Sequence, residues 1–248
     1  MSEIFSFDIV GITDTGRVRS HNEDCIGWDM RRNLAVLADG MGGHSAGAVA
    51  SKMTVDGVLY DYQPSTNDTL NERADIRQLL DNINADIYKL AQENPDCARM
   101  GTTLVMLCLN DDHITVAHVG DSRLYRFRNG KIEQITEDHS LVRQLIEQGT
   151  MTKEDAENSR YSNVITRALG VRASCDIDVN EYAVEINDVY LLCSDGLSNK
   201  VSDNSIRLLL GDSNGDWGQV VKALVDQANQ AGGEDNISIV LAAVTTAS

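Results

Sequence analysis

Four short segments of the sequence place an acidic residue beside glycine or asparagine, next to a run of apolar residues. A carboxylate in such a turn can reach a cleft, and glycine lets a main-chain carbonyl approach a cation closely. Carboxylates that meet in one cleft repel one another at neutral pH unless a cation lies between them. Oxygen ligands of this kind suit Mg²⁺ or Mn²⁺. The acidic residues of the four segments are Asp39, Asp121, Asp195, and the pair Glu234 and Asp235.

The same residues have a simpler explanation. Asp-Gly and Gly-Asp are common in ordinary turns, and each segment taken alone fits a turn better than a metal ligand. Spacing and composition leave both interpretations open. A fifth segment places Arg19 close to Glu23 and Asp24. It is either a solvated polar turn or an arginine fork for a phosphate, with two acids held near a metal.

Apolar runs must position these acidic turns. Several of the runs are continuous rather than alternating, which is typical of strands covered on both faces. Asn129-Gly130 predicts a type I′ hairpin between strands at residues 124–127 and 132–135, because both residues readily adopt positive φ angles. The other strand-like runs are residues 7–13, 34–39, 103–109, 114–119, 189–194 and 237–244.

Helical periodicity, with apolar residues three and four positions apart, appears in four places. Ser45 is a candidate N-cap for the first helix, and Gly232-Gly233 would end the last one. A further helix would open at Thr152, with Asp155 in the capping-box position. The four helical segments are residues 45–59, 76–90, 141–146 and 217–228.

The order of these elements predicts an α+β protein. It lacks the regular alternation of strand and helix that builds a parallel α/β sheet. We expect two antiparallel β-sheets packed face to face in a central sandwich, with helices on the outside. No Pro-rich hinge, long linker or low-complexity tract divides the 248 residues. We therefore expect a single domain that comprises residues 1–248.

Six motifs, in order, resemble those of the type 2C (PPM) metal-dependent protein phosphatases, most closely the compact bacterial branch. Any one motif is a weak signal, but all six in a chain of this length are specific. The resemblance implies a serine/threonine phosphatase with paired helices on each side of the sandwich (α-β-β-α), a metal cleft at one end, and a small helical flap at about residues 144–170. The motifs are Arg19-x-x-Asn22-Glu23-Asp24, Ala38-Asp39-Gly40-Met41-Gly42-Gly43-His44, Met100-Gly101-Thr102-Thr103, Gly120-Asp121-Ser122-Arg123, Ser194-Asp195-Gly196 and Asp235-Asn236-Ile237-Ser238.

The resemblance also implies a role for each residue of the site. Asp39 would bridge two catalytic Mn²⁺ or Mg²⁺ ions, and the Gly40 carbonyl would bind one of them. Asp195 and Asp235 would hold the other ion. Glu23 would act on the first ion through water.

The remaining roles concern the surroundings of these ions. Asp121, together with Asp195, would form a third, weaker metal site. Asp24 would orient the ligands of the first ion, and Asn236 would support the ligands without binding a metal. Arg19 would clamp the phosphate of the substrate.

The expected reaction is hydrolysis of phosphoserine or phosphothreonine by direct attack of a hydroxide that bridges the two metals, without a phosphoenzyme. The proton for the leaving group comes either from His44 or from water, because Met41 stands where eukaryotic relatives carry a histidine. Asn199 replaces a further acid of many relatives, which would loosen the second or third metal site. Residues 159–163 depart from the usual flap sequence, which leaves room for a different substrate preference.

Charge and composition limit the partners. A net charge of −17 disfavours nucleic acid and membrane surfaces. The N-terminal residues carry no signal-peptide pattern, and five scattered cysteines fit a reducing cytoplasm. We expect a cytoplasmic monomer that acts on phosphorylated proteins and opposes a bacterial, eukaryotic-like serine/threonine kinase. The alternatives are a catalytically silent phosphoprotein-binding regulatory domain and, less in keeping with the charge, a two-metal nuclease.

Overall fold

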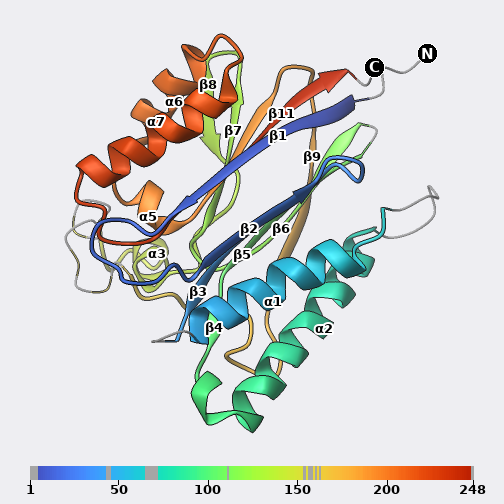
Figure 1. The fold of residues 1–248 in the computed structure, drawn as a ribbon, viewed down its shortest axis with the longest axis vertical. Coiled ribbons are helices and arrows are strands. Elements are labelled where there is room, and N and C mark those ends of the chain that lie inside the picture. Colours follow the sequence, from blue (N-terminus) through green and yellow to red (C-terminus); the bar gives the residue numbers. More distant parts are fainter. Residues whose placement is uncertain are drawn as a thin grey trace.

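The computed structural model describes residues 5–42, 46–64, 72–110, 112–152, 155, 159, 161 and 163–246. Two antiparallel sheets lie face to face, as the sequence predicted (Figure 1). The strand order is β1-β11-β10-β7-β8 in one sheet and β2-β3-β5-β6-β9 in the other, where β4 also pairs with β3. The strands are β1 (Phe5–Asp14), β2 (Asp24–Asp29), β3 (Leu34–Met41), β4 (Gly101–Thr102), β5 (Leu104–Leu109), β6 (His113–Val119), β7 (Arg123–Arg128), β8 (Lys131–Gln134), β9 (Asp178–Ala183), β10 (Val189–Cys193) and β11 (Ile237–Thr246).

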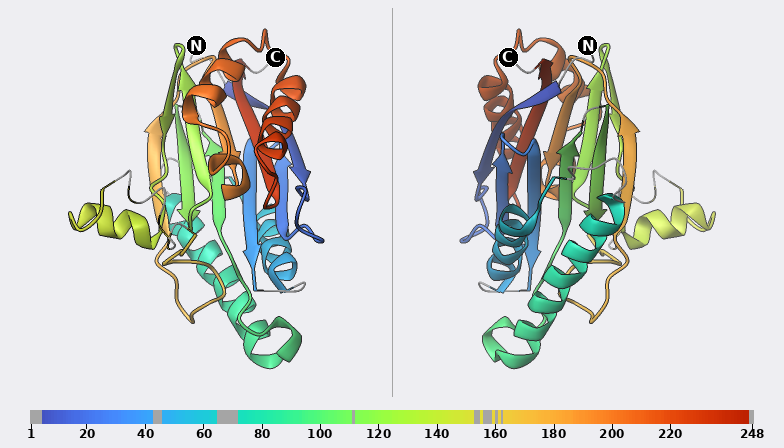
Figure 2. Two further views of the ribbon diagram at one scale, coloured as in Figure 1. Left: turned by 90° about the vertical axis from the view of Figure 1, so that its left-hand side faces the viewer. Right: turned by 90° about the vertical axis from the view of Figure 1, so that its right-hand side faces the viewer.

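Helices cover the outer face of each sheet. Helices α1 and α2 pack on the sheet that contains β3, and α6 and α7 pack on the sheet that contains β11 (Figures 1 and 2). The short helix α3 instead projects from the side of the sandwich (Figure 2). The helices are α1 (Ala46–Asp61), α2 (Glu72–Glu93), η1 (Pro95–Cys97), α3 (Leu141–Glu147), α5 (Asp195–Ser198), α6 (Asp203–Gly211) and α7 (Trp217–Gln230).

Strand β3 shows why the central strands have continuous apolar sequences. Leu34 and Val36 face α1 and α2, whereas Ala35 and Leu37 face the opposite sheet. Both faces of the strand are therefore removed from water, and a polar residue on either face would be buried. Tyr190 of β10 also lies in the layer between the sheets and is fully buried.

Two predictions from short sequence patterns can be checked in the described residues. Asn129 and Gly130 have φ angles of 51° and 76°, which confirms the predicted hairpin. The Thr152 hydroxyl accepts from the Asp155 amide at 3.1 Å, which is the N-cap bond of a capping box, whereas the Asp155 carboxylate accepts from the Thr152 hydroxyl at 2.7 Å rather than from the Thr152 amide. Most of the helix expected after Thr152, and the proposed N-cap Ser45, lie outside the described residues. Among the described residues, no helix combines the length and apolar character needed to cross a bilayer.

Candidate metal centre

The predicted acidic residues come from strand ends at one end of the sandwich. Asp24 begins β2 and Asp39 lies near the end of β3, and the two are register partners. Asp121 follows β6, Asp195 follows β10 and Asp235 precedes β11. A cleft of about 880 Å³ opens beside the last three. Its charged lining residues are Asp121, Arg123, Glu137, Asp138, Arg143, Asp195, Lys200, Glu234 and Asp235.

Burial, and after it the charges of neighbouring acids, makes these carboxyl groups harder to ionise. Burial raises the pKa of Asp39 well above its ordinary value, and the charges of Asp24 and Asp195 raise it further. Burial also raises the pKa of Asp24 to about 6, that of Asp121 to about 6 and that of Asp195 to about 7. The group therefore resists full ionisation near neutral pH unless positive charge is placed within it.

Two oxygens of this group have no hydrogen-bond partner within the described part of the chain. They are Oε1 of Glu23 and Oδ1 of Asp24, and both are buried. An unpaired buried carboxylate oxygen is costly, and a divalent cation, or a water molecule bound to that cation, would satisfy it. The other oxygen of Asp24, Oδ2, accepts a hydrogen bond from Ser194 Oγ at 2.8 Å. The residues present therefore fit Mg²⁺ or Mn²⁺.

Two threonines fix the backbone of Asp39. Its N–H donates to Thr103 Oγ1 at 3.0 Å, and its carbonyl accepts from Thr102 Oγ1 at 2.8 Å and from the Thr103 amide at 2.9 Å. Thr103 Oγ1 also shares a hydrogen bond of 2.7 Å with Ser122 Oγ, next to Asp121. One hydroxyl thus connects the turns that carry Asp39 and Asp121.

Gly40 allows helix α1 to approach the strand directly. A Cβ atom at this position would lie 2.2 Å from the carbonyl oxygen of Gly47 and 2.5 Å from that of Glu23. Any side chain would therefore displace backbone. The Gly40 amide donates to the Glu23 carbonyl at 3.1 Å, which holds the Glu23 segment beside Asp39.

Asn236 ties the N-terminal acidic segment to the start of β11. Its Nδ2 donates to the carbonyls of Thr15 and His21 at 3.0 and 2.9 Å. Its Oδ1 accepts from the Glu23 amide at 2.8 Å, and its own amide donates to Asp235 Oδ1 at 2.8 Å. The position of Glu23 relative to Asp235 therefore depends on this amide side chain.

Two further polar side chains contact the acids. Arg19 Nη2 lies 2.8 Å from Asp235 Oδ2, and the Arg19 side chain is half exposed (51%). Asn199, which stands in place of a further acid, donates to Asp195 Oδ2 at 3.2 Å. Asn199 therefore adds a donor to Asp195 where an acid would have added negative charge.

Some residues of the predicted site cannot be placed. His44, the candidate proton donor, lies outside the described residues, as do Gly43, Arg160 and Ser162.

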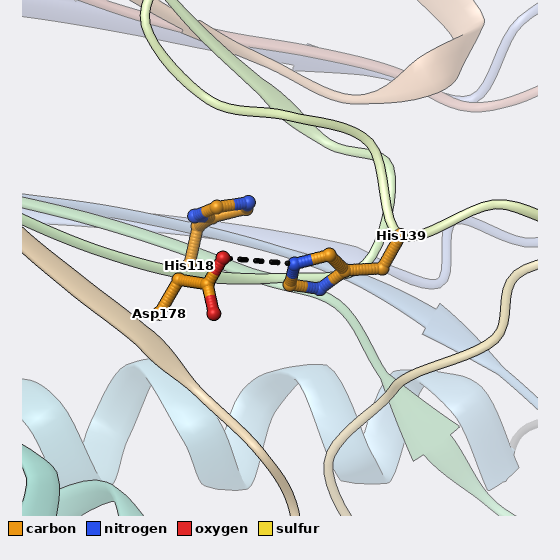
Figure 3. Close-up of side chains that lie close together, drawn as sticks. All are labelled: His118, His139 and Asp178. Atoms are coloured by element: carbon orange, nitrogen blue, oxygen red, sulfur yellow. Dashed lines mark hydrogen bonds and ion pairs between the residues drawn. The ribbon is translucent and has the colours of Figure 1, made fainter. Parts of the chain in front are cut away.

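A second group of potential ligands did not emerge from the sequence. His118, His139 and Asp178 offer ligand atoms within 4.8 Å of one another (Figure 3). The two imidazoles are stacked, with centroids 4.6 Å apart and planes 25° from parallel, so their in-plane lone pairs run alongside each other rather than converging on one ion. Arg167 Nη1 already lies 3.2 Å from Asp178 Oδ1 and 3.3 Å from His139 Nε2. A guanidinium therefore takes the place that a cation would need.

Known protein phosphatases are similar to this chain along most of its length. The family model "Protein phosphatase 2C" matches residues 16–242. The serine/threonine phosphatase stp of Listeria monocytogenes is 38% identical over 234 residues, which cover 92% of each chain. The protein phosphatase PhpP of Streptococcus pneumoniae is 37% identical, covering 93% of this chain and 94% of that protein.

The fold is similar to solved structures of such enzymes. The catalytic domain of the serine/threonine protein phosphatase PstP, solved in complex with two manganese ions, superposes with a TM-score of 0.85. It is 33% identical, and the match covers 97% of this chain and 99% of that domain. From the acidic motifs, the antiparallel sandwich and these relatives, we conclude that the chain belongs to the protein phosphatase 2C family.

Proposed function

We propose that this protein hydrolyses phosphoserine and phosphothreonine in other proteins and requires divalent cations. The observation that carries the proposal is the group of acids around Asp39, in which two buried oxygens, one on Glu23 and one on Asp24, have no donor among the described residues. Such a group is stable at neutral pH when cations occupy it. The names of the relatives supply the class of substrate.

The residues that would hold the metals follow from the chemistry of their oxygens. Asp39 is proposed to bridge two ions, with Glu23 and the Gly40 carbonyl on one side and Asp195 and Asp235 on the other. Asp121 would hold a third, weaker ion together with Asp195. All these donors are oxygens, which favours Mg²⁺ or Mn²⁺ over softer metals.

Bound cations would supply Lewis acidity, which lowers the pKa of water and neutralises charge on the phosphoryl group. Side chains of the protein would bind the phosphate, orient the acids and supply the proton. Arg19 is half exposed beside Asp235, so its guanidinium can turn toward a phosphate in the cleft and pair with two of its oxygens. Asp24 and Asn236 would orient the acids. The proton for the leaving alkoxide would come from His44 or from water.

The setting of the enzyme is part of the proposal. We propose that its partners are phosphorylated proteins and a serine/threonine kinase whose action it reverses. Cys25, Cys97, Cys108, Cys175 and Cys193 are all free thiols, which supports a reducing, cytoplasmic location. A monomer is proposed because one chain supplies every acid of the site.

The test is release of phosphate from a phosphothreonine peptide by the purified protein, in parallel with EDTA, Mg²⁺ and Mn²⁺. Asp39→Asn tests the site, and Asp8→Asn serves as its matched control because Asp8 is an exposed carboxylate on β1. We expect release that depends on the metal, is lost in Asp39→Asn and is unchanged in Asp8→Asn. A folded protein that releases no phosphate under any of these conditions would favour the silent phosphoprotein-binding domain instead.

A further inference from the structure

His139 lies at the point where the chain leaves the sandwich for α3. Its carbonyl accepts from the Thr166 amide at 2.7 Å and from the Thr166 hydroxyl at 3.1 Å. The next residue, Ser140, forms an isolated β-bridge with Ile165. The segment that carries α3 therefore departs and returns at the same place, and His139 joins its two ends.

The same residue is bonded twice to the turn that carries Asp121. The His139 amide donates to the Gly120 carbonyl at 2.8 Å, and the Gly120 amide donates to His139 Nδ1 at 3.2 Å. A nitrogen that accepts an N–H carries no proton, so these contacts assign the proton of the neutral imidazole to Nε2.

On the opposite side of the ring, Nε2 has two neighbours among the described residues. Arg167 Nη1, 3.3 Å away, has only protons to donate, so the Asp178 carboxylate is the one neighbour that can accept the Nε2 proton. His139 Nε2 lies 3.2 Å from Asp178 Oδ2, to which it can donate (Figure 3). Arg167 Nη1 donates to the other oxygen, Asp178 Oδ1, at 3.2 Å. Burial, His118 and Arg167 lower the pKa of His139 and together outweigh Asp178, which faces the ring and raises it. The ring is therefore held in its neutral form with Nδ1 directed at Gly120.

Gly120 has little freedom of its own. Its φ angle is +102°, and a Cβ atom here would lie 2.6 Å from Thr103 Cγ2. Thr103 therefore packs against one side of the turn and, through Ser122, is hydrogen-bonded to it. His139 adds its two hydrogen bonds with Gly120 to this contact.

We propose that His139 is a positioning residue for Asp121. Its Nδ1 fixes the Gly120 amide, and thereby the angle at which the following carboxylate faces Asp195 in the cleft. The inference rests on the proposed function, because it assigns Asp121 to a metal.

Two substitutions separate the two nitrogens of the ring. In His139→Asn the amide oxygen can replace Nδ1 as the acceptor for Gly120, but nothing reaches Asp178. In His139→Gln the longer amide can replace Nε2 as the donor to Asp178, but the acceptor for Gly120 is lost. If His139 only stabilised the fold, both substitutions would weaken Mn²⁺ binding to a similar extent.

The measurement is a calorimetric titration of Mn²⁺ into metal-free full-length protein, without substrate, with Asp121→Asn as the reference. We expect Asp121→Asn to lose the weakest binding event. His139→Gln should weaken that event by about 10-fold or more, as loss of a group that orients a ligand does, and His139→Asn should restore affinity close to that of the wild type. Equal weakening by both variants, or no effect of His139→Gln, would overturn the proposal.

Two controls keep the outcome clear. If the wild type binds Mn²⁺ and releases phosphate while His139→Gln binds like the wild type, only this inference fails. If the wild type neither binds Mn²⁺ nor releases phosphate, the proposed function itself fails.

Should the variants not fold, a long-range ¹⁵N–¹H correlation spectrum of the wild-type protein assigns the tautomer. The proposal requires the proton on Nε2 of His139, and a proton on Nδ1 would overturn it.

Discussion

Asp24 and Asp39 are register partners in the antiparallel pair β2–β3, so two carboxyl groups lie directly opposite each other at the end of a sheet. Like charges in this relationship destabilise a sheet. Residues 35 and 37 of β3 face the opposite sheet, and by alternation Asp39 does so too. Ser194, which directly follows β10 of the opposite sheet, donates to Asp24. The sandwich thus brings negative charge together where its two sheets meet.

Asp39→Asn should abolish turnover without unfolding the protein. The substitution preserves shape but removes the charge that we propose bridges two cations. We expect kcat to fall by more than about 100-fold, beyond the loss that follows removal of a group that merely orients a ligand. Thermal unfolding in EDTA should show that the variant is at least as stable as the wild type, because one of several repelling charges has gone. Asp235→Asn should also lose activity, and normal turnover in either variant would remove these residues from the metal site.

The stability of the metal-free protein should fall as pH rises from about 4 to 7. The ordinary pKa of an aspartate is 3.8, and burial raises that of Asp24 to about 6 and that of Asp195 to about 7. Between these values the folded state binds more protons than the unfolded state, so the free energy of unfolding decreases with pH. Each unit of pKa difference corresponds to about 1.4 kcal/mol.

Urea unfolding in EDTA at a series of pH values measures this effect. Asp195→Asn is the control and should flatten the curve, because it removes one of the raised groups. Mn²⁺ should reverse the trend, since cations replace the protons as pH rises. A metal-free stability that is constant or rises from pH 5 to 7 in the wild type, and is not altered by Asp195→Asn, would contradict the raised pKa values of these acids.

Arg19→Ala should raise KM for a small phosphate ester several-fold and leave kcat largely unchanged. The guanidinium is half exposed and can move from Asp235 to a bound phosphate, so its loss weakens binding of substrate and transition state alike. Arg31→Ala is the matched control. Arg31 is exposed, and it follows the end of β2 that lies opposite to the end at Asp24. If kcat falls while KM stays constant, Arg19 acts in the transition state.

Thr103→Val should destabilise the fold by about 1–3 kcal/mol, since it leaves the Asp39 amide without its buried acceptor. Thr103→Ser retains the hydroxyl and should recover most of that loss. Denaturant unfolding in EDTA separates this structural effect from any effect on metal binding. Equal stability of the valine variant and the wild type would mean that the hydroxyl does not join the turns of Asp39 and Asp121.

The fold was predictable wherever burial dominates the sequence. The continuous apolar runs at β3, β5, β10 and β11 identified central strands, because both of their faces are covered. Strand β9 (Asp178–Ala183) went unnoticed, because it lies at a sheet edge and most of its residues are only partly buried or exposed. Helix α6 (Asp203–Gly211) was also missed, although Ile206 and Leu210 lie four positions apart and Ser202 is its N-cap.

The acids of the site were predictable from their turns, whereas the groups that hold them were not. Asp39 and Asp195 each lie beside glycine after an apolar run, which is a local signal. His139 contacts Gly120, Asp178 and Arg167 only because three distant segments meet. No spacing in the chain encodes that meeting, since it depends on the path of the chain around α3.

The most direct test of the metal assignment is the anomalous scattering of manganese in crystals grown with Mn²⁺. We expect two strong peaks on either side of Asp39, one toward Glu23 and the other toward Asp195 and Asp235, and a weaker one beside Asp121. Manganese between His118 and His139, with none at Asp39, would contradict this assignment.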